Sequence, residues 1–273
     1  MPILSRTGIK INRAYEIPRY ISALRCTDSN IITMVAGGGA NCGLYYGSNG
    51  FNCSNGVIVN NTIDGGAVSN DGLTLHDGGS HNGCTNFFIG FNYVIGGLEN
   101  SVDIGGEYDD VTIMGNTIIG GPSQAINYAS LVISDAGGTA KPVGVFVIGN
   151  TISQHATSKG FGIEAKGTSH IYGNLVTCGN LYAGSNIASG IRIDRAGCTL
   201  ENNTFIGSAA PVVSLTIIRL VTGITDAVIR NNLVISRTND SQLIWGNTAA
   251  DVYACTIDGN YWVITASQSV NPW

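Results

Sequence analysis

One short phrase recurs eight times along the chain: an asparagine that stands between two apolar runs. It reads TIMGNTIIG around Asn116 and TLENNTFIG around Asn203. The full series is Asn61, Asn92, Asn116, Asn150, Asn174, Asn203, Asn232 and Asn260. Its spacing falls within the period of about 20–50 residues that is typical of solenoids and other repeat architectures. The repeat therefore constrains the fold more than any other feature of the sequence.

Three short apolar runs make up each repeat: one before the asparagine, one after it and one further along. The third run reads DGLTLHD at 71–77, NSVDIGG at 100–106, FGIEAK at 161–166 and SGIRIDR at 189–195. These runs have strand length and alternate apolar with other residues, which favours strands over helices. Three strands per repeat predict an all-β parallel β-helix of about eight coils, whose stacked faces close one core. We expect each asparagine to take a left-handed bend and to hydrogen-bond to its neighbours in an asparagine ladder.

One elongated domain is expected, because no linker-like break interrupts the repeat. Residues 51–265 form the predicted β-helix, residues 1–50 hold an N-terminal cap and the first coil, and residues 266–273 form a tail. The seven cysteines show no metal-ligand spacing, so we expect buried free thiols, with a Cys53–Cys84 disulfide as the alternative.

Charge and hydropathy exclude two classes of partner. The segment 1–25 has a net charge of +4, which leaves −9 on the rest of a chain whose total is −5. Such an acidic body disfavours nucleic acid as a partner. No run reaches about 18 continuous apolar residues, so no membrane span is expected, and the N-terminus shows no signal peptide. The sequence therefore indicates either a secreted, extracellular protein whose leader has been removed or a phage virion protein.

Asparagine at the sharp turn between the second and third strand of a coil, as in VTIMGNTIIG, resembles the asparagine ladder of right-handed parallel β-helix proteins. The resemblance covers about residues 50–265 and points to the pectin-lyase-like superfamily. That superfamily includes polysaccharide lyases, polygalacturonase-type hydrolases, alginate epimerases and phage tailspikes. The resemblance implies a single-stranded right-handed β-helix with a substrate groove along the first strand of each coil.

The third run of each repeat corresponds to this first strand. Side chains alternate between the two faces of a strand, so the apolar residues of the run point inward. The predicted outward residues are Thr74, His76, Asp103, Gly105, Glu164, Lys166, Arg192 and Asp194. In a chain with only 11% charged residues, this concentration of ionisable groups is the main functional feature.

Cleavage of a uronate glycoside by β-elimination needs a cation for the carboxylate, a base for the C5 proton and an acid for the leaving oxygen. Lys166 and Arg192 come from adjacent coils and are similar to the Lys/Arg pair of β-helical alginate and chondroitin lyases. We therefore predict a lyase acting on an acidic polysaccharide, with a glycoside hydrolase as the second choice. The predicted catalytic residues are Lys166, Arg192 and His76, and the predicted substrate-binding residues are Asp103, Glu164, Asp194, Arg195 and His81.

In the lyases of that superfamily nearby carboxylates hold calcium, which implies a calcium (Ca) site at Asp103, Glu107 and Glu164. Dense oxygen-rich loops bind calcium in general. The chain has such a run of carboxylates at Glu99, Asp103, Glu107, Asp109 and Asp110. Tyrosine suits stacking on sugar rings. The tyrosines expected in exposed loops are Tyr45, Tyr46, Tyr108, Tyr128 and Tyr182.

Two other functions fit the same residues. A tailspike-like or adhesin module would bind a surface glycan without cleaving it and would form a homotrimer, whereas a lyase would be a monomer. A structural solenoid would use its outward charges only for solubility, since charged surface residues are usually just solvated.

Overall fold

The computed structural model describes residues 9–12, 24–28, 31–33, 42–47, 54–66, 70–76, 84–121, 128–134, 141–155, 160–179, 189–207, 215–221, 223–236 and 241–264. Several sequence predictions lie outside this part of the chain. They concern Cys53, His81, Tyr182, the 266–273 tail and the side chains of Tyr45 and Tyr46.

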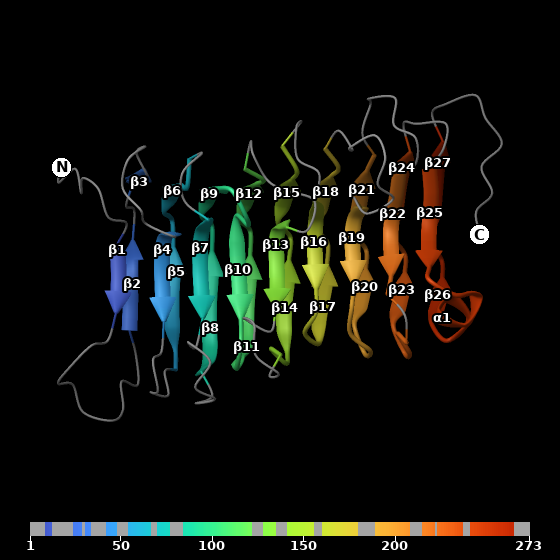
Figure 1. The fold of residues 1–273 in the computed structure, drawn as a ribbon, viewed down its shortest axis with the longest axis horizontal. Coiled ribbons are helices and arrows are strands. Elements are labelled where there is room, and N and C mark those ends of the chain that lie inside the picture. The colour runs from blue at the N-terminus through green and yellow to red at the C-terminus, as the bar shows by residue number, and fades with distance from the viewer. Residues whose placement is uncertain are drawn as a thin grey trace.

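The described chain is almost entirely β-strand, arranged in three parallel sheets of nine strands each. We number the sheets 1, 2 and 3 in the order in which the chain first enters them. Successive strands belong to sheets 1, 2 and 3 in turn, so each strand pairs in parallel with the third strand after it in the sequence. Figure 1 shows the strands stacked side by side from blue to red, as in a solenoid. The predicted all-β solenoid with parallel strands is confirmed at this level.

The strands of the three sheets have the following bounds. Sheet 1 consists of β1 (Ile9–Asn12), β4 (Cys42–Gly47), β7 (Asp71–His76), β10 (Val102–Gly105), β13 (Ala129–Ser134), β16 (Phe161–Ala165), β19 (Ser189–Ile193), β22 (Leu215–Leu220) and β25 (Ser241–Gly246). Sheet 2 consists of β2 (Leu24–Asp28), β5 (Gly56–Val59), β8 (Cys84–Gly90), β11 (Tyr108–Met114), β14 (Val145–Ile148), β17 (Ser169–Tyr172), β20 (Thr199–Glu201), β23 (Val228–Arg230) and β26 (Thr256–Asp258). Sheet 3 consists of β3 (Ile31–Thr33), β6 (Thr62–Asp64), β9 (Tyr93–Ile95), β12 (Thr117–Ile119), β15 (Thr151–Ser153), β18 (Leu175–Thr177), β21 (Thr204–Ile206), β24 (Leu233–Ser236) and β27 (Tyr261–Ile264).

The sheets reach back into the segment 1–50, where a cap and the first coil were predicted: β1 already pairs with β4. Within the described ranges the only helix is α1 (Ala249–Tyr253), which follows β25. Thr248 caps its N-terminus, because the Thr248 side chain and the Asp251 carboxylate bond to each other's backbone N–H groups. No helix in the described ranges has the length and apolar character that crossing a membrane requires.

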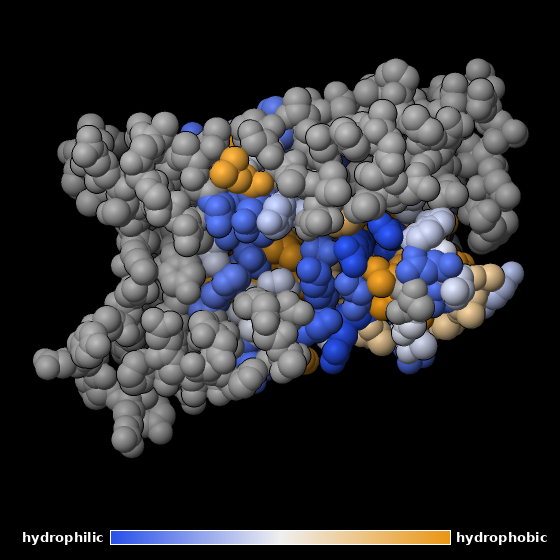
Figure 2. Space-filling view, viewed as in Figure 1, coloured by the Kyte–Doolittle hydropathy of each residue, from blue (hydrophilic) through white to orange (hydrophobic). Residues whose placement is uncertain are grey.

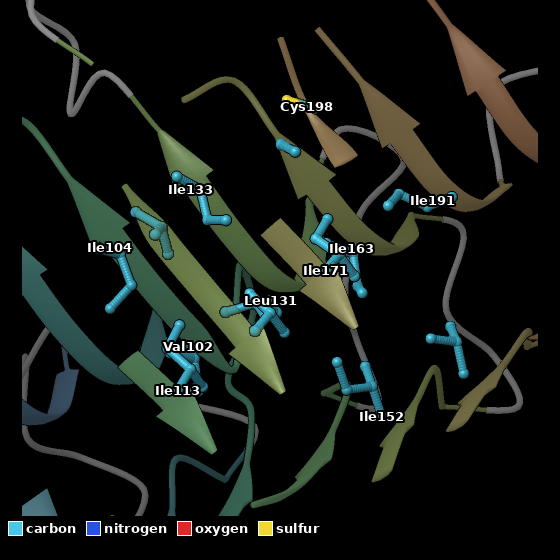
Figure 3. Packing of buried hydrophobic residues seen from close by; sticks show 14 of the residues in the cluster. Val102, Ile104, Ile113, Leu131, Ile133, Ile152, Ile163, Ile171, Ile191 and Cys198 are labelled. Atoms are coloured by element: carbon cyan, nitrogen blue, oxygen red, sulfur yellow. The ribbon is translucent and has the colours of Figure 1, made fainter. Parts of the chain in front are cut away.

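The core is built from columns of branched aliphatic side chains that repeat from strand to strand. In sheet 1, Val102 is in register with Leu131, and Leu131 with Ile163. Figure 3 shows these side chains meeting Ile113 and Ile171 of sheet 2 across the interior. All are fully or almost fully buried. A single strand cannot bury its apolar face alone, so this stacking is what stabilises the solenoid.

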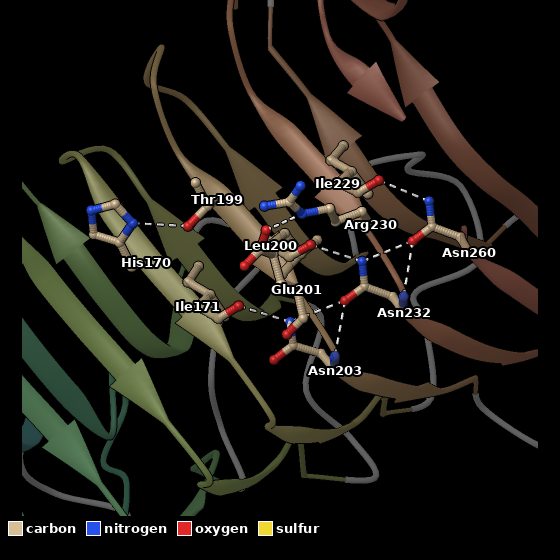
Figure 4. Close-up of polar contacts among 10 residues, drawn as sticks. All are labelled: His170, Ile171, Thr199, Leu200, Glu201, Asn203, Ile229, Arg230, Asn232 and Asn260. Carbon is tan, nitrogen blue, oxygen red and sulfur yellow. Dashed lines mark hydrogen bonds and ion pairs between the residues drawn. The ribbon is translucent and has the colours of Figure 1, made fainter. Parts of the chain in front are cut away.

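The repeated asparagines bond to one another at the turn between sheets 2 and 3. The side-chain Nδ2 of Asn203 donates to Oδ1 of Asn232 at 3.0 Å, and Asn232 donates to Asn260 at 2.9 Å (Figure 4). The same bond joins every earlier pair in the series at 2.9 to 3.0 Å. Each Nδ2 group from Asn92 onward also donates to a main-chain carbonyl of the preceding layer, as Asn203 does to Ile171.

The left-handed bend belongs to the residue before each asparagine, and the prediction that the asparagine itself adopts it is wrong. Positive φ angles of 55° to 66° occur at Asn60, Phe91, Gly115, Gly149, Gly173, Asn202, Asn231 and Gly259. Glycine and asparagine tolerate this conformation with little strain, whereas a bulky residue such as Phe91 does not. At seven of the eight bends the residue with positive φ is a glycine or an asparagine. The asparagine that follows the bend directs its side-chain amide along the stack of coils.

One further sequence prediction fails in the core. Tyr108 was expected in an exposed loop, but it begins β11, is fully buried and lies edge-on to Phe87 with ring centroids 5.2 Å apart. Cys84 is fully buried, as expected for these thiols, and the alternative Cys53–Cys84 disulfide involves Cys53, which lies outside the described residues. The strand alternation accounts for the burial of both residues, because Tyr108 and Cys84 are register partners on the inward side of sheet 2.

Candidate functional site

The outward side of sheet 1 carries one row of side chains, which we call the outer row. Each strand contributes one register position to it, and the row runs Thr74, Asp103, Val132, Glu164, Arg192, Arg219 and Trp245. Figure 2 shows hydrophilic side chains gathered in a hollowed strip across the middle of one face of the molecule, the face on which sheet 1 lies in Figure 1. Neighbouring positions of the row are one strand spacing apart, about 4.8 Å.

Much of the outer row is covered although it points away from the core. Thr74 and Glu164 are each only 1% exposed and Asp103 is 7% exposed. Alternation in the sequence predicts that these residues point outward, and their register agrees with that. Their burial could not be anticipated, because a period of two gives the direction of a side chain and not what packs over it.

A buried carboxylate organises the centre of the row. Lys166 Nζ lies 3.3 Å from Glu164 Oε2, and Arg192 Nη1 lies 3.1 Å from Glu164 Oε1. Arg192 Nη2 also donates to Asp194 Oδ2 at 3.0 Å. The structure thus brings together four predicted site residues: Glu164 and Arg192 from the neighbouring strands β16 and β19, and Lys166 and Asp194, which directly follow those strands. Burial raises the pKa of Glu164, while the charges of Lys166 and Arg192 act in the opposite direction.

The two cations of this group remain accessible. The side chain of Lys166 is 29% exposed and that of Arg192 is 24% exposed, whereas that of Glu164 is only 2% exposed. The Arg192 guanidinium carbon also lies 5.4 Å from the ring centroid of Phe161. Glu164 therefore anchors both cations from below and leaves part of each for a ligand.

Arg219 continues the row and was missed by the sequence analysis. Its guanidinium carbon lies 4.9 Å from the ring centroid of Trp245, the next position in the row. Burial lowers the pKa of Arg219, and the charge of Arg192 acts in the same direction. Their strands read LTIIRL and SQLIWG, and ASLVIS supplies Val132. These runs lack the clear apolar–polar alternation that identified the other strands, so the period gave no indication of them.

An acidic group lies toward the N-terminal end of the row. His76 Nε2 lies 3.0 Å from Asp103 Oδ2, and the Ser134 hydroxyl donates to Asp103 Oδ1 at 3.0 Å. Asp71 accepts hydrogen bonds from the Thr74 hydroxyl and from Asn100. Burial and the neighbouring charge of Asp103 raise the pKa of Asp71 from 3.8 to about 6. The sequence did not indicate a site role for Asp71. Asp71 is two residues before the inward Leu73, so alternation along the strand assigns both to the inward side.

Tyr128 extends the acidic group. Burial raises the pKa of its phenol, and Glu99, which shares a hydrogen bond with it, raises that pKa further. The charge of Asp71 adds to the same effect. Tyr128 lies immediately before the strand β13 and is partly buried. It therefore stands at the start of a central strand of sheet 1 and not in a freely exposed loop.

The predicted calcium ligands do not converge on one point. Asp103 and Glu164 stand on either side of Val132 in the outer row, two strand spacings or about 10 Å apart. Calcium needs its oxygen ligands at about 2.3–2.6 Å. Asp109 instead accepts a hydrogen bond from the backbone N–H of Val143 at 2.8 Å. Across the described ranges, no three His, Cys, Asp or Glu side chains are grouped so that they could hold a metal ion. The calcium site, including Glu107, stays a prediction that this geometry does not support.

The remaining predicted site residue, Arg195, is exposed and follows β19. Comparison of the chain with models of known protein families, with curated proteins and with solved structures gave no match. The architecture defines a class, a parallel β-solenoid with a row of charged, partly covered side chains on one sheet.

Proposed function

We propose that this chain is a right-handed parallel β-helix protein of the pectin-lyase-like kind that binds an acidic polysaccharide along the outer row and cleaves it by β-elimination. The hydrogen-bonded asparagines support this fold proposal, because seven consecutive side-chain bonds join the eight predicted positions, as an asparagine ladder requires. An amide can donate and accept along a stack at every layer, which a side chain without both groups cannot do.

One observation carries the proposal: three cations stand on, or directly after, three neighbouring strands of one sheet. Lys166 directly follows β16, and Arg192 and Arg219 stand on β19 and β22. The carboxylates paired among them are Glu164 and Asp194. The group therefore keeps one positive charge in excess. Strand spacing is similar to the length of a sugar residue, so a glycan lying across the strands meets a new side chain at each sugar. An acidic glycan matches the excess charge.

The central pair has the groups that β-elimination requires. The reaction removes the C5 proton, forms a double bond between C4 and C5, breaks the C4–O bond and returns a proton to the leaving oxygen. Arg192 neutralises the substrate carboxylate and so stabilises the charge that develops when the proton leaves C5. Lys166, held by Glu164, accepts the C5 proton as the base and then donates a proton to the leaving oxygen of the same sugar linkage.

His76 belongs to a different position along the glycan. Its strand β7 is three places before β16 in sheet 1, which separates His76 from Lys166 by about 14 Å. A group at that distance cannot act on the same sugar. His76, Asp103 and Ser134 are therefore proposed as a neighbouring subsite rather than as part of the lyase centre.

The test is an ultraviolet assay with alginate, pectate and glycosaminoglycans, each with and without calcium. A lyase gives an unsaturated uronate whose absorbance rises with time, and Lys166→Ala and Arg192→Ala abolish that rise. Arg230→Gln is the control, because Arg230 pairs with Glu201 on sheet 2, away from the outer row. No rise with any acidic glycan under either condition contradicts the lyase proposal.

Glycoside hydrolysis is the second candidate, and a separate observation favours it. A glycosidase needs one protonated and one ionised carboxyl group. Asp71, with its pKa raised to about 6, lies close enough to Asp103 for their charges to interact. In the same assay, hydrolysis releases reducing ends without ultraviolet absorbance, and Asp71→Asn abolishes that release. Reducing ends that persist in Asp71→Asn contradict this candidate.

A further inference from the structure

Two buried donors on Arg219 have no hydrogen-bond partner. These are Nε and Nη1, and both are shielded from solvent. Leaving a charged donor buried without an acceptor is unfavourable, so folded proteins rarely keep one without a reason. The neighbouring Arg192 shows the contrast, because its Nη1 and Nη2 lie within ion-pair distance of Glu164 and Asp194, and only its Nε is a buried atom without a hydrogen-bond partner.

No carboxylate of the described residues forms an ion pair with Arg219. Glu164 and Asp194 act on it only through space, and Arg192 is its direct register partner on the next strand. Like charges at directly opposite positions repel each other. An anion bound at the exposed part of Arg219 would offset this repulsion.

Trp245 holds the guanidinium in an orientation that suits such an anion. The cation–π contact at 4.9 Å uses the flat face of the guanidinium, so its N–H groups point along the plane of the group and not into the ring. Each edge of a guanidinium that matches the two oxygens of a carboxylate or a sulfate includes Nη2, which in Arg219 is not among the buried, unpartnered atoms. Trp245 is itself only partly buried, so its indole also offers an apolar surface to a sugar ring.

We propose that Arg219 and Trp245 form an additional binding subsite for the acid group of a sugar, one strand beyond Arg192 toward the C-terminal end of the outer row. The subsite would take a carboxylate- or sulfate-bearing pyranose and would set the preference for an acidic residue at that position of the glycan. This inference rests on the proposed glycan binding but not on cleavage.

Titration calorimetry tests the subsite with three probes of equal length: a galacturonate trisaccharide, a sulfated trisaccharide and a neutral galactose trisaccharide. Wild-type protein is expected to bind one or both acidic probes and not the neutral one. Arg219→Gln should weaken that binding about tenfold or more, since it removes a charge-assisted pair. Arg219→Lys keeps the charge but loses the two-donor edge, so it should weaken binding to a smaller extent.

Arg230→Gln is the matched control, because it removes the same charge from the opposite part of the molecule and should leave every affinity unchanged. Wild-type affinity in both Arg219 variants, or equal binding of the neutral probe, overturns the subsite. Cleavage and binding fail separately: acidic probes that bind through Arg219 without being cleaved support the subsite and contradict the lyase. Cleavage with an unchanged KM in both Arg219 variants supports the lyase and contradicts the subsite.

Discussion

Two glutamate–arginine pairs of this chain have the same register geometry but different surroundings. Glu164 faces Arg192 in sheet 1, and Glu201 faces Arg230 in sheet 2. The side chain of Glu164 is almost completely buried, whereas that of Arg230 is half exposed. Figure 4 shows the Glu201–Arg230 pair. An exposed pair is screened by water, but a buried one leaves an uncompensated charge when a partner is lost.

Glu164→Gln is expected to lower the free energy of unfolding by about 3 kcal/mol, because Lys166 and Arg192 lose their shared carboxylate in a poorly hydrated site. Glu201→Gln, the same change in an exposed pair, should lower it by about 0–1 kcal/mol. Urea denaturation of both variants measures the difference. Equal losses would show that the outer row is as solvated as sheet 2.

Asp71 makes stability depend on pH in a defined direction. Its folded-state pKa is raised from 3.8 to about 6, so the folded state binds this proton more tightly than the unfolded chain does. The contribution of Asp71 is therefore fully present below pH 3.8 and is lost as pH rises through about 6, by up to about 3 kcal/mol.

Asp71→Asn stays neutral at every pH and should remove this loss, so the variant gains stability relative to the wild type between pH 4 and pH 6. Denaturation midpoints measured across that range test the expectation. Asp258→Asn removes the same charge from an exposed position of β26 and serves as the control. A constant difference between Asp71→Asn and the wild type across the range contradicts the raised pKa.

At the scale of the element, the turn between sheets 2 and 3 separates two tasks. The residue before each asparagine supplies the left-handed backbone, and the asparagine supplies the bonds between layers. Phe91 is an exception to the glycine or asparagine found at the bend of the other coils, and it remains largely exposed. The bond network therefore tolerates one strained residue, since seven other bends are relaxed.

Asn150→Ala is expected to destabilise the protein by about 3 kcal/mol or more. It removes the bond to Asn174, takes the acceptor Asn150 Oδ1 from the backbone N–H of Asn116, and takes the Asn150 Nδ2 donor from the carbonyl of Ile113. Asn260→Ala, at the last position of the series, should have a smaller effect because Asn260 is only partly buried. Thermal unfolding of both variants tests the ladder, and equal shifts would contradict it.

At the scale of the whole molecule, the outer row is electrically asymmetric. The acidic group around Asp71 and Asp103 lies toward the N-terminal end of sheet 1, and the cations Lys166, Arg192 and Arg219 lie toward the C-terminal end. An acidic glycan therefore meets attraction at one end of the strip and repulsion at the other. This favours one placement along the strip, with the acid groups over β16, β19 and β22.

The lyase proposal expects a monomer of 28.4 kDa in solution, because each chain carries a complete row. A homotrimer would instead favour a tailspike-like glycan-binding module. Light scattering over a range of protein concentrations measures the mass directly. A trimer that persists on dilution and does not cleave acidic glycans would replace the lyase proposal with the binding one.

Sequence alone predicted a large part of the site. Glu164, Lys166, Arg192 and Asp194 come from runs with clear alternation, and the structure brings all four together. It did not predict Arg219, Trp245 or Asp71, because LTIIRL and SQLIWG hide their alternation and Asp71 sits at a strand start. It also placed Tyr108 in a loop, since a strand that begins beside a cluster of acidic residues shows little apolar character.

By itself the sequence determined the parallel stacking of three strands per repeat and the inward side of most strands. These follow from a period and an alternation, which are local properties of the chain. Only the tertiary structure decided which outward side chains share a row and which are covered. Row neighbours such as Glu164, Arg192 and Arg219 come from successive repeats, and their register depends on how each intervening turn closes. Burial of Glu164 further depends on what packs over it, and no local pattern encodes that.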